Sequence, residues 1–62
     1  MIIYQPWIDV GGSDGEYATY KQSLHLRKET AFKELEAKIE EIGKISEIII
    51  LKKGISEIEV IE

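Results

Sequence analysis

A single helical stripe of apolar residues dominates the second half of this chain. Phe32, Leu35, Ile39 and Ile42 recur at intervals of three or four residues, which is the spacing of one face of an α-helix. Three lysines in this stretch each follow a glutamate by four positions, a favourable order for helical side-chain pairs. Gly43 is a typical C-terminal stop. We therefore predict an amphipathic helix over residues 29–43, with one face buried.

Two β-branched runs follow this helix and flank Lys52-Lys53-Gly54. A glycine between two such runs is typical of a β-hairpin. We predict strands over residues 45–52 and 55–61, joined by a turn at Lys53-Gly54.

The predicted hairpin has apolar residues on both of its faces. Ile49 and Leu51 would pack against the helix, which leaves Ile48, Ile50 and Ile55 on the outer face. Burying each isoleucine contributes about 1.5–3 kcal/mol, so leaving them in water weakens a small fold considerably. We predict that these three residues form an interface, covered by a second copy of the chain or by another protein.

Alternation of apolar and polar residues predicts a strand over residues 2–9, and Pro6 places that strand at an edge or a bulge. Ile3 and Trp7 share one face of this strand. We predict that they join the apolar interface, although Trp7 would suit a protein core as well. The glycine-rich stretch 10–15 predicts a loop.

Residues 16–26 fit two patterns. As a strand they place Tyr20 and Leu24 on one face, and as a helix they begin with a Ser13-x-x-Glu16 capping box. The helix would continue to Ile42 and would be far longer than the usual 11–12 residues. The strand is favoured, and it gives an α+β fold of order ββαββ in one domain of residues 1–62, with one helix packed on an antiparallel sheet.

The composition restricts how the chain is stabilised. It has 62 residues, no cysteine and one histidine, so disulfides are excluded and a zinc site is not expected. Neither a signal peptide nor a membrane span is evident, and the cytoplasm is the expected compartment. Residues 29–62 carry the whole net charge of −4, which suits a basic protein surface. Abundant Lys and Glu with few amides is a tendency of thermophile proteins.

No catalytic or cofactor motif is present in the sequence. His25 has no acidic partner that the sequence can place beside it. The loop from Asp9 fails the EF-hand pattern, because Asp14 stands where glycine is required. We expect no enzymatic activity, no cofactor, no metal and no small-molecule substrate.

An alternative function is single-stranded nucleic-acid binding by aromatic and basic side chains. The candidate residues are Tyr17, Tyr20, Lys21, Arg27 and Lys28. The acidic second half opposes this function, so nucleic acid is an unlikely partner.

Asp14-Gly15, Tyr17-x-x-Tyr20-Lys21-x-x-Leu24-x-Leu26 and Ser46-Glu47-Ile48-Ile49 are the residues that carry a resemblance to a known family. Over residues 14–51 the chain resembles the small acidic uracil-DNA glycosylase inhibitors of Bacillus phages. The resemblance implies a DNA-like charge, a dimer, a strand over residues 16–26 and an interface role for Phe32. The stretch before Phe32 is longer here, and a C-terminal strand is added.

The sequence as a whole therefore predicts a non-catalytic protein-binding or regulatory module, and a structural domain with no ligand of its own is the remaining alternative. We expect it to form a homodimer and to resemble a small phage- or virus-type inhibitor.

Overall fold

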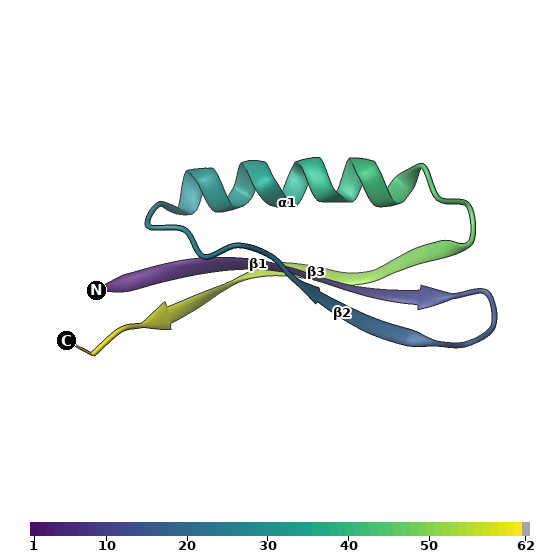
Figure 1. Cartoon of the computed structure of the whole chain (residues 1–62), viewed down its shortest axis with the longest axis horizontal. Coiled ribbons are helices and arrows are strands. Elements are labelled where there is room, and N and C mark those ends of the chain that lie inside the picture. The colour runs from purple at the N-terminus through teal and green to yellow at the C-terminus, as the bar shows by residue number, and fades with distance from the viewer. Residues whose placement is uncertain (62) are drawn as a thin grey trace.

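A computed structural model describes residues 1–61, which form three strands and one helix in the order ββαβ. The elements are β1 (Ile2–Gly12), β2 (Tyr17–Lys21), α1 (Lys28–Gly43) and β3 (Ile48–Glu59). The central strand β1 pairs antiparallel with both neighbours, so the sheet order is β2-β1-β3. Helix α1 lies along one face of this sheet (Figure 1). The fold is α+β, as predicted.

The predicted second hairpin is wrong, because residues 48–59 form one continuous strand. Strand β1 is long enough to pair with β3 from end to end, so the chain has no need to turn at Lys53-Gly54. Gly54 stands opposite Trp7, and a Cβ atom at Gly54 would lie 2.8 Å from Trp7 Cζ2. The glycine therefore makes room for the indole ring instead of forming a turn.

The expected orientation of β3 is also wrong. Ile48, Ile50 and Ile55 share one face, but that face packs on the core beneath the helix. Leu51 is an extra residue in β3 opposite the step from Asp9 to Val10, and this bulge keeps the three isoleucines on one side. Their contacts with the core take up the apolar surface that we expected a partner to cover.

The core lies between β1 and α1. Ile8 is fully buried at the centre of the sheet, and Val10 lies beside it. Leu35 and Ile42 of the helix pack against them from above. Ala31, also fully buried, lies close to the start of the helix. Leu35, Ile39 and Ile42 of the predicted apolar stripe thus form one side of the core, whereas Phe32 is half-exposed. Helix α1 begins one residue before the predicted helix.

Strand β2 ends at Lys21, five residues earlier than the strand predicted for residues 16–26. The chain then stays close to β1 without forming a regular ladder. His25 makes an isolated bridge with Tyr4, and each backbone N–H donates to the other residue's carbonyl over 2.8 Å. The alternative of one long helix from residue 16 is excluded.

Pro6 lies in the central strand, so its predicted position at an edge or a bulge is wrong. The backbone N–H of Gln22 donates to the Pro6 carbonyl over 2.9 Å, and an ordinary residue 6 would return a bond to the Gln22 carbonyl. Proline has no N–H to give. The side-chain amide of Gln5 donates to that carbonyl instead, over 2.8 Å. A side chain thus replaces the missing backbone donor.

Within residues 1–61, no helix is long and apolar enough to cross a membrane.

Candidate functional site

The sheet face turned away from α1 has no second layer in the described chain, and we call it the open face. Its side chains belong to residues that alternate with the core residues along each strand. They are Ile3, Gln5, Trp7, Asp9 and Gly11 of β1, Tyr17, Thr19 and Lys21 of β2, and Ile49, Leu51, Lys52, Gly54, Ser56 and Ile58 of β3.

Apolar side chains gather at the two ends of the open face. At one end Ile49 is 62% exposed, and Leu51 is 49% exposed and lies over Gly11. At the other end Ile58 is 36% exposed and stands opposite Ile3. Large aliphatic side chains exposed together on one surface are a usual sign of a contact surface.

Trp7 lies towards the Ile58 end of the open face. Its indole ring extends across β3 and covers Gly54. The strand beneath the ring buries part of the side chain, which leaves Trp7 half-buried. The structure therefore places Trp7 and Ile3 on the outer face, where the sequence had put them, but with Ile58 as their neighbour in β3.

The middle of the open face is polar and carries a net positive charge. Asp9 accepts a hydrogen bond from the Thr19 hydroxyl over 2.6 Å, which orients the only carboxylate of this face. Lys21 lies beside Trp7, and Lys52 lies beside Asp9. Neither lysine forms a salt bridge with any residue from 1 to 61. Both ammonium groups are therefore available to an acidic partner.

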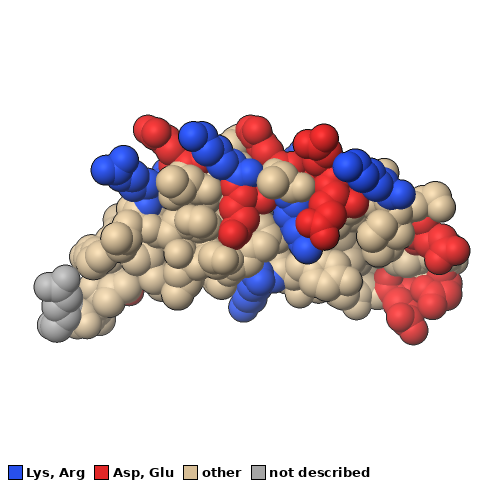
Figure 2. Space-filling view, turned by 45° about the horizontal axis from the view of Figure 1, so that its top comes forward, with Lys and Arg blue, Asp and Glu red and all other residues tan. Residues whose placement is uncertain are grey.

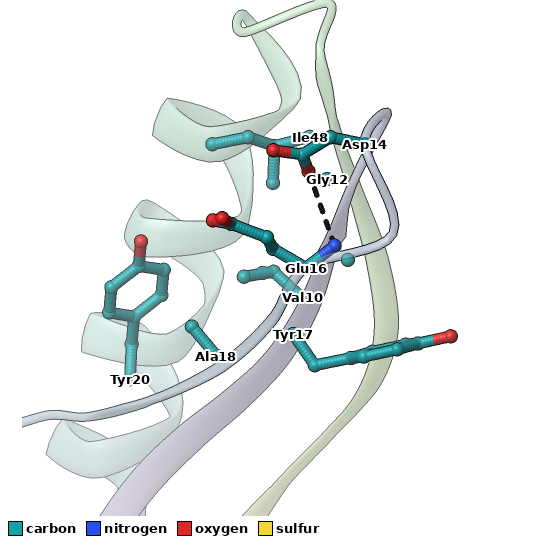
Figure 3. A pocket seen from close by; sticks show the side chains of 9 residues that line it. Val10, Gly12, Asp14, Glu16, Tyr17, Ala18, Tyr20 and Ile48 are labelled. Carbon is teal, nitrogen blue, oxygen red and sulfur yellow. Dashed lines mark hydrogen bonds between the residues drawn. The ribbon is translucent and has the colours of Figure 1, made fainter.

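A hollow lies on the helix side of the sheet, where β2 extends beyond the cover of α1. Val10, Ala18, Tyr20 and Ile48 line it, and Glu16 points into one end (Figure 3). Asp14 is held at the same end because its Oδ1 accepts the Glu16 backbone N–H over 3.2 Å. The hollow is shallow and mostly apolar, and it gathers no group of metal-binding side chains in the described chain.

His25 and Glu34 form the only histidine–carboxylate pair in residues 1–61. The sequence could not place an acidic partner beside His25, and the structure supplies one, because the His25 Nε2 lies 3.1 Å from Glu34 Oε1. The backbone N–H of Ser23 donates to the same oxygen over 2.9 Å. The hydrogen bond from His25 is the main cause of a lowered pKa for Glu34. Since both donors meet one carboxylate, Glu34 fastens the segment after β2 to the helix.

The residues predicted for nucleic-acid binding are not brought together. Tyr17 and Lys21 lie on the open face, whereas Tyr20 lies on the helix side of β2 (Figure 3). Arg27 and Lys28 stand at the start of the helix, where Lys28 Nζ lies 4.0 Å from Glu57 Oε2.

The helix surface differs from the open face in its charge. Acidic and basic side chains are mixed along α1, and acidic side chains also gather at the end of the molecule formed by the β1–β2 turn (Figure 2). Asp14 and Glu16 belong to that turn, and the Ser13 N–H there bonds to the Glu47 carbonyl. The open face carries fewer charged side chains than the helix, namely those of Asp9, Lys21 and Lys52.

Comparison of the chain with protein-family models, with curated proteins and with solved structures finds no match. The resemblance to the glycosylase inhibitors of Bacillus phages therefore stays a prediction.

Sequence reasoning missed the three β3 residues that define the open face, Ile49, Leu51 and Ile58. The run of four apolar residues at 48–51 shows that both faces of this strand are apolar. It does not show which face the helix covers. Only the pairing of Trp7 with Gly54 and the bulge near Val10 decide that.

Proposed function

We propose that this protein is a non-catalytic protein-binding module and that its open face is the contact surface. The observation that carries the proposal is the exposure of Ile49, Leu51 and Ile58 on a sheet face with no second layer in residues 1–61. A partner that covers them would bury aliphatic surface worth about 25 cal/mol per Å².

The polar centre of the open face supports a partner with a particular chemistry. Lys21 and Lys52 flank the centre, while Asp9 is already bonded to Thr19. A complementary surface would carry apolar side chains at two ends and carboxylates between them. Such complementarity sets specificity and the rate of association more than the affinity itself.

The test compares two lysine variants of equal charge change. Ile49→Lys changes a residue of the open face, and Ala37→Lys changes an exposed residue of the helix. The wild type and Ala37→Lys are expected to retain the same partner from an extract, and Ile49→Lys is expected to lose it. The purified partner should then shift the emission of Trp7, the only tryptophan, towards the blue.

Equal retention of the partner by both variants, or an unchanged Trp7 emission on binding, would show that the open face is not the contact surface. Circular dichroism of each variant separates a lost contact from a lost fold.

A second candidate function is the binding of single-stranded nucleic acid on the same face. Trp7 and Tyr17 lie on the open face together with Lys21 and Lys52. Aromatic side chains can stack on unpaired bases while neighbouring lysines bind the phosphates. An oligo(dT) titration at low salt should quench Trp7 if this function is correct. An unchanged emission would reject it and leave the protein-binding function.

A further inference from the structure

The free edge of β3 is a second unpartnered surface, distinct from the open face. β3 is twelve residues long and pairs along one side with β1, while its other side has no neighbouring strand in the described chain. A strand edge of this length is a template for pairing with another strand. We propose that β3 pairs antiparallel with β3 of a second copy, about a two-fold axis at Ile55.

The backbone directions along β1 show which groups of the sheet point towards β3. Tyr4 and Pro6 bond through their backbones to the chain that follows β2. Alternate residues of an antiparallel strand bond to opposite neighbours. Gln5, which lies between them, therefore turns its backbone groups towards β3.

The same alternation identifies the groups at the free edge. Ser56 stands opposite Gln5, so its backbone groups turn towards β1. Ile55 and Glu57 therefore turn their N–H and C=O groups away from β1, and Lys53 does the same two residues earlier. These three residues offer backbone donors and acceptors to a second strand.

The two-fold axis could pass through Lys53, Ile55 or Glu57, and each position gives a different register of the two β3 strands. The charges of the side chains favour one of these registers. An axis at Lys53 or at Glu57 would place like charges directly opposite each other, which is destabilising. An axis at Ile55 places Ile55 opposite its own copy and each Lys53 opposite Glu57 of the other copy. This register is therefore self-complementary in charge.

The helices fit the same arrangement. α1 packs over β1 and β3 and does not reach β2 in residues 1–61. With strands about 4.8 Å apart, a helix centred between β1 and β3 lies about 5 Å from an axis placed half a strand spacing beyond β3. The two helices would then be about 10 Å apart, close to the 8–10 Å of packed helix pairs.

Phe32 is the helix residue that this pairing would cover. It is 50% exposed although it belongs to the apolar stripe, and it lies beside Lys53 and Ile55 at the β3 side of the helix. An axis at Ile55 would bring the two Phe32 rings towards each other. Paired aromatic rings contribute beyond the area that they bury.

The surface available is large enough for a specific dimer. The register at Ile55 pairs residues 51–59 of the two copies, a length of about 30 Å at 3.3 Å per residue. The molecule is 19 Å across along its second axis, the direction in which helix and sheet are stacked (Figure 1). The side of each copy along the paired part of β3 therefore has a projected area of about 570 Å². The area of the two copies together exceeds the roughly 1,000 Å² of a biological interface.

The experiment uses charge reversal at the paired positions. Lys53→Glu and Glu57→Lys each replace two attractive cross-strand pairs by two repulsive pairs. Mixed together, the two variants regain both attractive pairs in a heterodimer. Lys33→Glu and Glu40→Lys, on the exposed helix surface, make the same charge changes away from the edge and serve as controls.

Sedimentation equilibrium of the full chain measures the result, with circular dichroism as the check on folding. The wild type and both controls are expected to dimerise at micromolar concentration. Each edge variant should dimerise about tenfold to a hundredfold more weakly, and the equimolar mixture should return close to the wild-type affinity. Ile49→Lys should leave the dimer intact, since that residue lies on the open face.

A monomeric wild type up to millimolar concentration would overturn the proposal. So would a dimer that both edge variants leave unchanged, or edge variants whose mixture stays monomeric. None of these results bears on partner binding by the open face, so the two proposals fail separately.

Discussion

The bond from Gln5 to the Gln22 carbonyl gives a sharp test of how this sheet is held together. The Gln5 amide replaces the N–H that Pro6 lacks, so the two residues should be energetically coupled. Removing the amide by Gln5→Ala leaves a partly buried carbonyl without its donor, which costs about 1 kcal/mol. Replacing Pro6 by alanine restores a backbone N–H aimed at the same carbonyl.

The expected loss of stability from Gln5→Ala depends on whether residue 6 is proline or alanine. Gln5→Ala should lower the free energy of unfolding by about 1 kcal/mol in the wild type, and by close to nothing in Pro6→Ala. Pro6→Ala itself should cost about 1–2 kcal/mol, because the proline ring is fully buried. A chain of this length is stable by roughly 3–9 kcal/mol, so both single variants and the double variant remain measurable.

Urea unfolding followed by circular dichroism is a suitable assay. A change of 1 kcal/mol shifts the midpoint by about 1 M when the slope is near 1 kcal/mol per M. All variants are compared at one protein concentration, since any association adds to the apparent stability. Ser56→Ala is the control, because Ser56 faces Gln5 on β3 without a side-chain hydrogen bond in residues 1–61. An equal loss from Gln5→Ala in both backgrounds would refute the substitution of side chain for backbone.

Three further predictions concern the core, the hydrogen bond between His25 and Glu34, and the indole ring of Trp7. Leu35→Ala removes a buried side chain and should cost about 2–5 kcal/mol in thermal or urea unfolding, enough to unfold much of the protein. The hydrogen bond from His25 lowers the pKa of Glu34 in the folded protein. The contribution of the Glu34 carboxylate to stability is therefore present above its ordinary pKa of 4.5, and it is lost as the pH falls through the lowered pKa. Urea midpoints between pH 3 and 6 should therefore fall less steeply for Glu34→Gln than for the wild type. Gly54→Ala should displace the Trp7 ring into solvent, and an emission maximum that does not move to the red would contradict that contact.

The helix and the general α+β class could be predicted because their signals are local. The apolar stripe and Gly43 specify α1 within a few neighbouring residues. Gly54 shows the limit of such reasoning. A glycine in a turn and a glycine beneath an aromatic ring look the same along the chain. What distinguishes them is Trp7, which is nearly fifty positions away in sequence and directly opposite in the sheet.

The face of a strand depends on a still finer feature. The period of a strand is two residues, so one extra residue at a bulge exchanges the two sides for everything beyond it. Beyond the bulge in β3, Ile48 and Ile50 share the helix side with Ile55, and Ile49 is left outside. The prediction of an uncovered apolar face remains for the open face, but the residues that form it are different. This is why a doubly apolar pattern that was recognised correctly still placed Ile48, Ile50 and Ile55 on the wrong face of the sheet.

The two proposed surfaces have a joint consequence for binding. Pairing of the β3 edges would extend each sheet into one six-stranded sheet with both helices on the same side. The two open faces would then become continuous, with Ile58 and Lys52 of opposite copies side by side at the junction. A partner that covers this surface would meet a two-fold symmetric target. Dimerisation would therefore present two equivalent contact surfaces at once, which strengthens the binding of any partner long enough to span them.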